Sequence, residues 1–286
     1  MNRISIAFLL LLPVLTFAQA GSEIYLFDLK NKKGELSISN GKNITNHKGY
    51  DNQPAFHPDE PSVFYSSFND DGRADIKSYN YKTGVTTSIT TTSEREYSPT
   101  ITPDKQFLSC IIQRDNNAQD LGKYPIKGGE AVVLINDLIV GYHTWIDPEQ
   151  LMIFVLGETN TLQLYNIRTK EHEVIEEKIG RSLHKIPGDD AISYVSKKTE
   201  AAWVIKKFEP QAKATADIFN TLPGSEDLCW TPDGKIIMSS DTKIYFIDPN
   251  HDKEWKIVTL QTPFTSKVSR LAVSKDGKKL AVVVAE

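Results

Sequence analysis

The chain has 286 residues, of which 40% are hydrophobic and 24% charged, and its formal net charge is −4. This length can bury a large hydrophobic core. The mild charge balance argues against nucleic acid or an anionic membrane surface as the main partner, because both require clustered Lys and Arg.

The first twenty residues have the layout of a secretory signal peptide. Arg3 provides a positive start, residues 4–17 form an apolar run, and Ala18-Gln19-Ala20 supplies a small-residue cleavage site. The run is short for a membrane span, and an uncleaved anchor is the alternative. No Cys follows the run to carry a lipid, and no later segment is apolar enough to span a bilayer. We expect a signal peptide at 1–20 and a periplasmic or secreted chain without an integral membrane segment.

A short strand, a turn with Pro, Asp or Gly, and a second apolar strand recur six times along the rest of the chain. The copies are PAFHPDEPSVFYSS from Pro54, PTITPDKQFLSCII from Pro99, HTWIDPEQLMIFVL from His143, LHKIPGDDAISYVS from Leu183, LCWTPDGKIIMSS from Leu228 and LAVSKDGKKLAVVV from Leu271. The aligned turn residues, 40 to 45 positions apart, are Pro58, Pro103, Asp147, Pro187, Pro232 and Lys275. A period of this length indicates a repeat architecture.

Each copy reads as four strands. In the first copy these are residues 53–56, 62–68, 74–81 and 85–91, and the last is rich in Thr, as a half-exposed outer strand favours. Four strands in about 40–45 residues make one propeller blade. An open β-sandwich is the alternative, although sandwiches do not repeat so regularly. The sequence predicts an all-β, six-bladed β-propeller with four-stranded antiparallel blades.

The two ends of the chain complement each other. The last copy has only two strands, at 268–273 and 279–284, and the two missing strands match residues 23–29 and 35–44. We expect the N-terminal strands to complete the sixth blade beside the C-terminus, which would close the ring and protect its edges. Residues 21–286 then form one propeller domain.

The segment PDEPSVFYSSFNDDGRADIKSYNYKTG, residues 58–84, resembles the repeat of the TolB-like six-bladed propeller family. The resemblance covers most of the chain and is weakest in blades three and four. It implies the propeller fold. The additional N-terminal domain of TolB has no counterpart here, so the resemblance does not imply TolB's partners.

Motifs of common enzyme classes are missing from the sequence. Gly180-Arg181-Ser182-Leu183-His184 lacks the second Gly of a hydrolase elbow, and His172-Glu173 is followed by Glu176 where a zincin has His. No phosphate loop, dinucleotide fingerprint or paired CxxC occurs. We therefore expect no catalytic triad, metal or cofactor. The turns Asn69-Asp70-Asp71-Gly72 and Asp115-Asn116-Asn117 keep calcium open as an alternative, although such turns are common for backbone reasons alone.

Two cysteines, Cys110 and Cys229, fall in blades two and five, which are opposite in a ring of six. A disulfide requires Cα atoms within about 7 Å. We therefore predict two buried free thiols.

A binding site is expected where the loops leading into the inner strands meet at the channel mouth. Residues five to seven positions before each aligned turn residue give the candidates. They are Asp51, Asn52 and Gln53 in blade one, Glu96 and Tyr97 in blade two, Tyr142 in blade three, Arg181 in blade four, Glu226 and Asp227 in blade five, and Arg270 in blade six. His143 and His184 also lie on inner strands, where ordinary packing is the simpler interpretation.

Two functions remain open. The first, which we favour, is a monomeric interaction module that binds a protein or peptide over the channel mouth. The second is a propeller enzyme, a lyase or hydrolase acting on carbohydrate, in which carboxylates such as Glu96, Glu226 and Asp227 serve as acid and base. The second requires two titratable groups that face each other across the channel.

Overall fold

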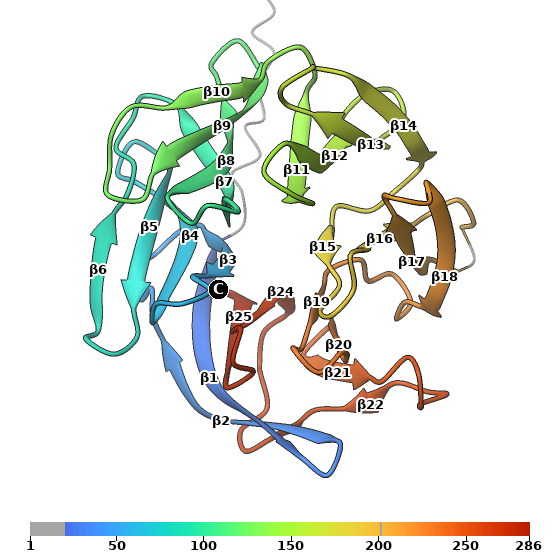
Figure 1. The fold of residues 1–286 in the computed structure, drawn as a ribbon. Coiled ribbons are helices and arrows are strands. Elements are labelled where there is room, and N and C mark those ends of the chain that lie inside the picture. The colour runs from blue at the N-terminus through green and yellow to red at the C-terminus, as the bar shows by residue number, and fades with distance from the viewer. Residues whose placement is uncertain (1–20, 201) are drawn as a thin grey trace, which may run out of the picture.

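The computed structural model describes residues 21–200 and 202–286, so the expected signal peptide at 1–20 lies outside the described residues. Six sheets are arranged in a ring around a central axis (Figure 1). The predicted all-β, six-bladed propeller is confirmed. Every regular element in the described residues is a strand. Accordingly, this part of the chain contains no helix that could cross a bilayer.

Blades one to three each contain four antiparallel strands in chain order. Blade one consists of β3 (Asp51–Phe56), β4 (Ser62–Phe68), β5 (Ala74–Asn80) and β6 (Val85–Ser88). Blade two consists of β7 (Arg95–Ile101), β8 (Phe107–Gln113), β9 (Gln119–Pro125) and β10 (Val132–Ile135). Blade three consists of β11 (Val140–Trp145), β12 (Gln150–Val155), β13 (Thr161–Asn166) and β14 (His172–Glu177).

Blades four and five follow the same plan, and blade six is assembled from both ends of the chain. Blade four consists of β15 (His184–Lys185), β16 (Ile192–Ser196), β17 (Val204–Glu209) and β18 (Ala214–Asn220). Blade five consists of β19 (Leu228–Trp230), β20 (Ile236–Ser240), β21 (Lys243–Ile247) and β22 (Lys256–Ile257). Blade six consists of β24 (Val268–Val273), β25 (Lys279–Ala285), β1 (Ser22–Lys32), β2 (Glu35–Asn43) and β23 (Thr259–Leu260).

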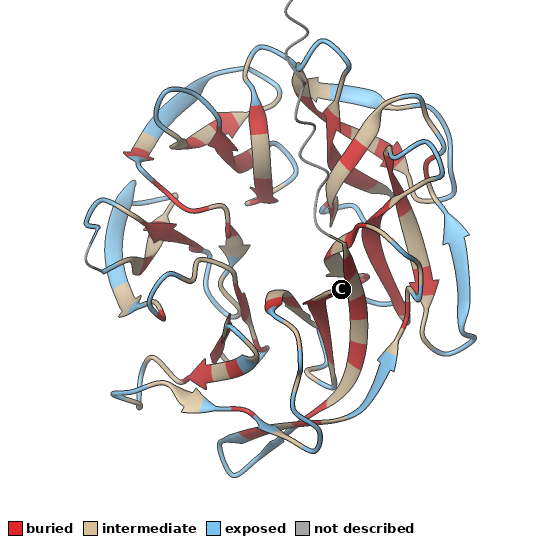
Figure 2. Ribbon diagram, turned by 180° about the vertical axis from the view of Figure 1, so that it is seen from behind, coloured by how far each residue is buried: buried red, intermediate tan, exposed pale blue. Residues whose placement is uncertain are grey.

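Burial explains why each blade has continuous apolar strands inside and polar ones outside. Six of the seven residues of β4 are buried, because neighbouring blades cover both faces of this strand. All four residues of β6 are exposed, and Figure 2 shows this outer strand in pale blue. The fourth strand of blade one is therefore shorter than the predicted 85–91, ending at Ser88.

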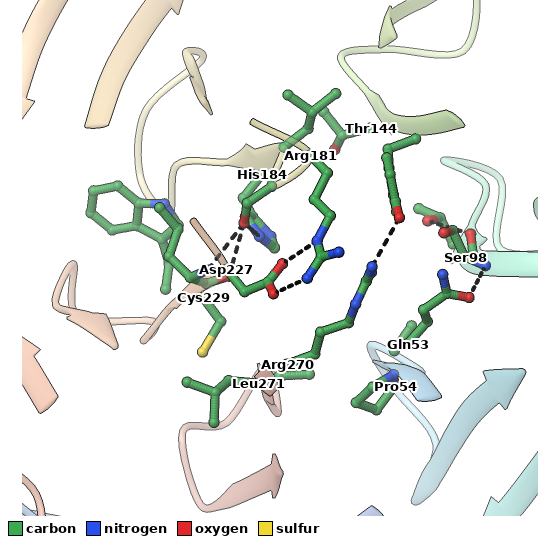
Figure 3. A pocket seen from close by; sticks show the side chains of 18 of the residues that line it. Gln53, Pro54, Ser98, Thr144, Arg181, His184, Asp227, Cys229, Arg270 and Leu271 are labelled. Atoms are coloured by element: carbon green, nitrogen blue, oxygen red, sulfur yellow. Dashed lines mark hydrogen bonds and ion pairs between the residues drawn. The ribbon is translucent and has the colours of Figure 1, made fainter. Parts of the chain in front are cut away.

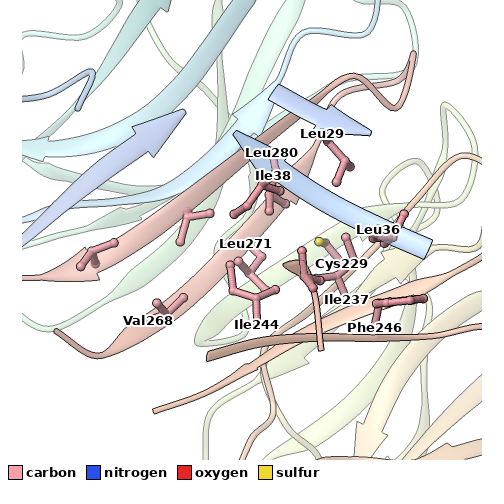
Figure 4. Close-up of a cluster of buried hydrophobic side chains, with 13 residues drawn as sticks. Leu29, Leu36, Ile38, Cys229, Ile237, Ile244, Phe246, Val268, Leu271 and Leu280 are labelled. Atoms are coloured by element: carbon pink, nitrogen blue, oxygen red, sulfur yellow. The ribbon is translucent and has the colours of Figure 1, made fainter. Parts of the chain in front are cut away.

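The hydrophobic core is divided among the six interfaces between neighbouring blades. At the interface of blades five and six, Ile237 and Phe246 pack against Leu36, Ile38 and Leu280 (Figure 4). Each fully buried side chain of this kind contributes roughly 1.5–3 kcal/mol relative to an exposed one. Comparable clusters join the other five pairs of neighbouring blades. The ring is thus held together by contacts between blades.

The predicted closure of the ring is confirmed. β1 pairs antiparallel with β25 from Ser22–Ala285 to Asp28–Lys279, and Ile24 lies opposite Val283. The two strands run side by side in Figure 1. Blade six also has a feature that the sequence did not predict: β23 adds a short parallel strand outside β2.

The two faces of the ring carry different turns. On one face, Asp59 in the first turn of blade one forms ion pairs with Lys105 of blade two and Lys275 of blade six. On the other face, Arg73 in the β4–β5 turn pairs with Asp115 in the corresponding turn of blade two. Equivalent turns therefore lie on the same face in neighbouring blades.

Both cysteines are free and buried, as predicted. Burial raises the pKa of each thiol above its ordinary value, so neither reacts readily as a thiolate. We expect the folded chain to show no rapid reaction with Ellman's reagent and the chain in guanidinium chloride to show two reactive thiols. Rapid modification of one thiol under native conditions would contradict this assignment.

Candidate functional site

Inner strands from all six blades enclose a cavity of about 340 Å³ on the axis. In every blade, the residue five positions before the aligned turn residue is among those that line this cavity. These residues are Gln53, Ser98, Tyr142, Ser182, Asp227 and Arg270. Because the repeat places equivalent positions around one axis, six side chains of five different types meet there (Figure 3).

Irregular strand pairing accompanies this position in several blades. In blades one and two the register to the second strand shifts between Asn52 and Ala55 and between Tyr97 and Thr100. Gln53 and Ser98, inside these shifts, have φ angles of 59° and 55°. Non-glycine residues seldom adopt this left-handed conformation, and bulges of this kind redirect side chains. Here the bulge directs Gln53 and Ser98 toward the cavity.

Gln53 connects blades one and two at the cavity wall. Its Oε1 accepts hydrogen bonds from the backbone N–H of Ser98 at 2.7 Å and from the Ser66 hydroxyl at 3.0 Å. Because a backbone N–H can only donate, this end of the amide is the oxygen. The Gln53 amide nitrogen is then left for another partner.

Arg181 and Asp227 form a bidentate ion pair between blades four and five. Arg181 Nε and Nη2 donate to the two Asp227 oxygens at 3.0 Å and 2.6 Å. Burial acts to raise the pKa of Asp227, but the Arg181 hydrogen bond and the positive charges of Arg270 and Arg181 outweigh it and lower the pKa. Asp227 is therefore ionised and neutralises Arg181.

Arg270 extends from blade six to the opposite blade. Its Nη2 donates to the Tyr142 hydroxyl at 2.9 Å, and its guanidinium carbon lies 5.1 Å from the centre of the Tyr142 ring. The Tyr142 ring is supported in turn by an edge-on contact with Phe154. Figure 3 shows Arg270 and Arg181 pointing into the same cavity, with Asp227 hydrogen-bonded to Arg181.

His143 is a buried, neutral member of the lining. The Ser109 hydroxyl lies 3.0 Å from the Thr100 carbonyl, which can only accept, and receives a hydrogen bond from Trp145 Nε1 at 2.9 Å. His143 Nε2, 2.7 Å from the same hydroxyl, must then donate and carry the proton. Burial lowers the pKa of His143 to about 3 and, as the largest of several effects, that of His184 to about 4.

This buried imidazole predicts a loss of stability in acid. The unfolded chain binds a proton at His143 near pH 6.5, whereas the folded chain resists it until about pH 3. The stabilisation that neutral His143 gives the folded state is present above pH 6.5 and is lost as the pH falls toward 3. The free energy of unfolding then decreases by about 1.4 kcal/mol per pH unit. His143→Gln keeps a donor for Ser109 and should remove this slope, as measured by urea unfolding between pH 7 and 4. Parallel pH profiles for the two proteins would contradict the assignment.

The structure brings five of the ten predicted site residues together at the cavity: Gln53, Tyr142, Arg181, Asp227 and Arg270. The other five, at positions six or seven before the turn residue, lie elsewhere: Asp51, Asn52, Glu96, Tyr97 and Glu226. Tyr97 packs edge-on against Tyr50. Asn52 donates to the Ser22 hydroxyl at 3.3 Å, which ties blade one to β1.

Glu96 is fully buried between blades one and two. Its carboxylate accepts hydrogen bonds from the hydroxyls of Thr90, Thr92 and Tyr124. Burial outweighs these hydrogen bonds and raises the pKa of Glu96. Asp51 is also buried, 3.6 Å from His47, and burial raises its pKa to about 6. Neither carboxylate lines the cavity. The prediction that Asp51 and Glu96 belong to a site at the channel mouth therefore differs from the structure, which buries both.

Glu226 lies beside the cavity, in a neighbouring hollow that Arg181 and Asp227 also line. It accepts the Arg181 backbone N–H at 3.1 Å and pairs with Lys197 at 2.7 Å. A Cβ at Gly180 would lie 2.7 Å from its carboxylate, so a larger residue there would displace the end of the Glu226 side chain. Glu226 therefore supports the backbone that carries Arg181.

Sequence reasoning missed Ser98 and Ser182 as lining residues. Both occupy the same repeat position as Tyr142 and Arg270, and this common spacing was the available signal. Within the described part of the chain, no group of three or more His, Cys, Asp or Glu residues is arranged to hold a metal ion. In one of the Asp/Asn-rich turns, Asp115 instead pairs with Arg73 and Arg95.

Comparisons with known proteins identify the fold. No protein-family model and no curated protein matches the chain in sequence. Among solved structures, a protein provisionally assigned as TolB from Agrobacterium tumefaciens is 13% identical with a TM-score of 0.72, covering 94% of this chain and 99% of that one. TolB from Acinetobacter baumannii is 12% identical with a TM-score of 0.58, covering 93% and 64%.

An enzyme shares the same architecture. Oligogalacturonate lyase from Vibrio parahaemolyticus is 15% identical with a TM-score of 0.54, covering 93% of this chain and 98% of that one. At these identities the likeness concerns the fold alone. The chain therefore has a TolB-like six-bladed propeller fold, whose site must be interpreted from its own residues.

Proposed function

We propose that this chain is an exported propeller that binds a peptide or a protein segment in its axial cavity. One observation carries the proposal: side chains from the same repeat position of all six blades converge on one cavity, and they are of five different types, with serine in blades two and four. Uniform residues would suffice to fill a ring structurally. A varied set at the same position is typical of a recognition site on a repeat scaffold.

The walls of the cavity suit an extended chain. Apolar surface comes from Pro54, Pro99 and Leu271, and hydrogen-bonding groups come from Gln53, Ser98 and the two arginines. Ligand sites commonly combine such apolar walls with a few well-placed polar groups. The proposed export rests on the signal-like residues 1–20.

The alternative, acid–base catalysis on a carbohydrate, receives less support from the geometry. Of the described residues that line the cavity, Asp227 is the one carboxylate, and Arg181 holds it in an ion pair. Glu96, which the catalytic hypothesis named as one of its carboxylates, is enclosed by Thr90, Thr92 and Tyr124. A binding function fits these contacts better.

Selection of peptides from a phage-displayed random library tests the proposal with residues 21–286 as the target. Selected peptides should bind the wild type and the Thr87→Trp variant, whose change lies on exposed β6. They should lose binding to Ala55→Trp, because Ala55 lines the cavity and is not part of a hydrophobic cluster. Failure to select any peptide, or equal binding to both variants, would contradict the proposal.

A further inference from the structure

The cavity contains one arginine without a counter-ion. Arg181 is neutralised by Asp227, and Lys185 lies 3.9 Å from Asp190. Arg270 forms no ion pair with a carboxylate of residues 21–200 or 202–286, and the remaining residues of the sequence include no Asp or Glu. Within the described residues Arg270 therefore has no carboxylate at ion-pair distance, although its charge also acts on Asp227.

Most of the hydrogen-bonding capacity of Arg270 is also unused. A guanidinium has five N–H donors in a fixed plane. Within the described chain, one of them is used, in the bond from Nη2 to the Tyr142 hydroxyl. The Tyr142 contact spans the cavity and fixes the direction of the long side chain, so little additional ordering is needed when a ligand binds.

We propose that Arg270 anchors a carboxylate of the peptide that occupies the cavity, an assignment that rests on the proposed function. The planar guanidinium matches a carboxylate in a two-bond fork. Tyr142 holds the fork in place from blade three. The Gln53 side-chain oxygen already accepts the Ser98 N–H, and the amide nitrogen of the same side chain provides a neutral donor at the cavity.

The charge count favours a peptide with one buried carboxylate over an acidic polysaccharide. An oligouronate carries a carboxylate on every sugar and would require a series of unpaired cations along the site. The cavity offers one free guanidinium, because Asp227 occupies the other. A C-terminal carboxylate or a single acidic side chain satisfies this pattern.

A thermodynamic cycle tests the assignment with the selected peptides. Each peptide is made with its carboxylates intact, with an amidated C-terminus, and with Asp and Glu replaced by Asn and Gln, and affinity is measured by calorimetry. Neutralising the anchoring carboxylate should weaken binding about ten- to a hundredfold. Arg270→Gln should cause a similar loss, with no further loss for the neutralised peptide, and Arg270→Lys should retain part of the affinity.

The matched control is Arg168→Gln, which removes an exposed arginine paired with Glu149 on the outer part of blade three and should leave affinity unchanged. Circular dichroism and the unfolding midpoint establish that each variant is folded. The contrary result is a set of peptides that lose binding to Ala55→Trp but bind Arg270→Gln as tightly as the wild type. That result would overturn the carboxylate anchor and would leave the proposed function supported.

A probe that does not depend on peptide selection separates the two proposals. The side-chain Nε–Hε resonance of Arg270 is followed by NMR during titration with N-acetylglycine and, in parallel, with digalacturonate. A saturable shift with N-acetylglycine alone supports a peptide carboxylate. A shift with digalacturonate alone would overturn the peptide class, and no shift with either would overturn the anion site.

Discussion

Replacing Ile24 with aspartate is expected to destabilise the whole ring by about 4 kcal/mol. Ile24 is completely buried, pairs with Val283, and packs in the cluster that joins blades six and one. A carboxylate at this point would have to enter the core without a partner or break the pairing of β1 with β25. Either event destabilises the contact that closes the ring.

Guanidinium unfolding followed by tryptophan fluorescence measures the loss of stability in blades that do not contain the mutation. The four tryptophans, Trp145, Trp203, Trp230 and Trp255, all lie in blades three to five. A lower midpoint for their transition means that closure stabilises the distant blades. Lys30→Asp, on the exposed part of β1, is the control and should change stability by less than about 0.5 kcal/mol. A wild-type midpoint in the Ile24 variant would show that closure acts only locally.

Replacing Glu96 with alanine is expected to cost about 3 kcal/mol of stability. The change removes the acceptor shared by Thr90, Thr92 and Tyr124 and leaves their hydroxyls inside a closed interface between blades one and two. The loss should appear as a lower midpoint in urea unfolding at pH 7. Peptide affinity should be unchanged below the melting transition, because Glu96 does not line the cavity.

Glu96→Gln is the matched variant, since it keeps one carbonyl acceptor and should cost much less. The raised pKa of Glu96 adds a pH test. A raised folded pKa stabilises the protein at low pH, and this contribution is lost as the pH rises through that value. Glu96→Gln cannot ionise, so its stability relative to the wild type should improve as the pH increases. Equal losses for the Ala and Gln variants would contradict the hydrogen-bonding role.

The fold could be predicted in detail because the repeat signals are local. Each turn and each apolar strand is encoded within a few residues, and the second strand of blade one was predicted at 62–68, its observed bounds. Closure also followed from the sequence, since two strands were missing at one end and present at the other. The extra strand β23 could not be foreseen, because it depends on how a loop returns alongside β2.

The site could be predicted only in part because the inner strands are irregular. In a regular strand, residues five and seven positions before the turn would point to the same side. The bulges around Gln53 and Ser98 break this alternation, so Gln53 lines the cavity whereas Asp51 and Glu96 are buried between elements. The repeat spacing correctly predicted which loops and inner strands surround the axis, and the bulges determine which of their side chains line the cavity.

Pairing between the first and the last long strand has a consequence for how the protein matures. β1 can pair with β2 as soon as both are made, but its other edge has no partner until β25 has been synthesised, so this edge stays unpaired throughout translation. The proposed export would benefit from such a delay, because a secretion channel that threads unfolded polypeptide would meet no prematurely closed ring.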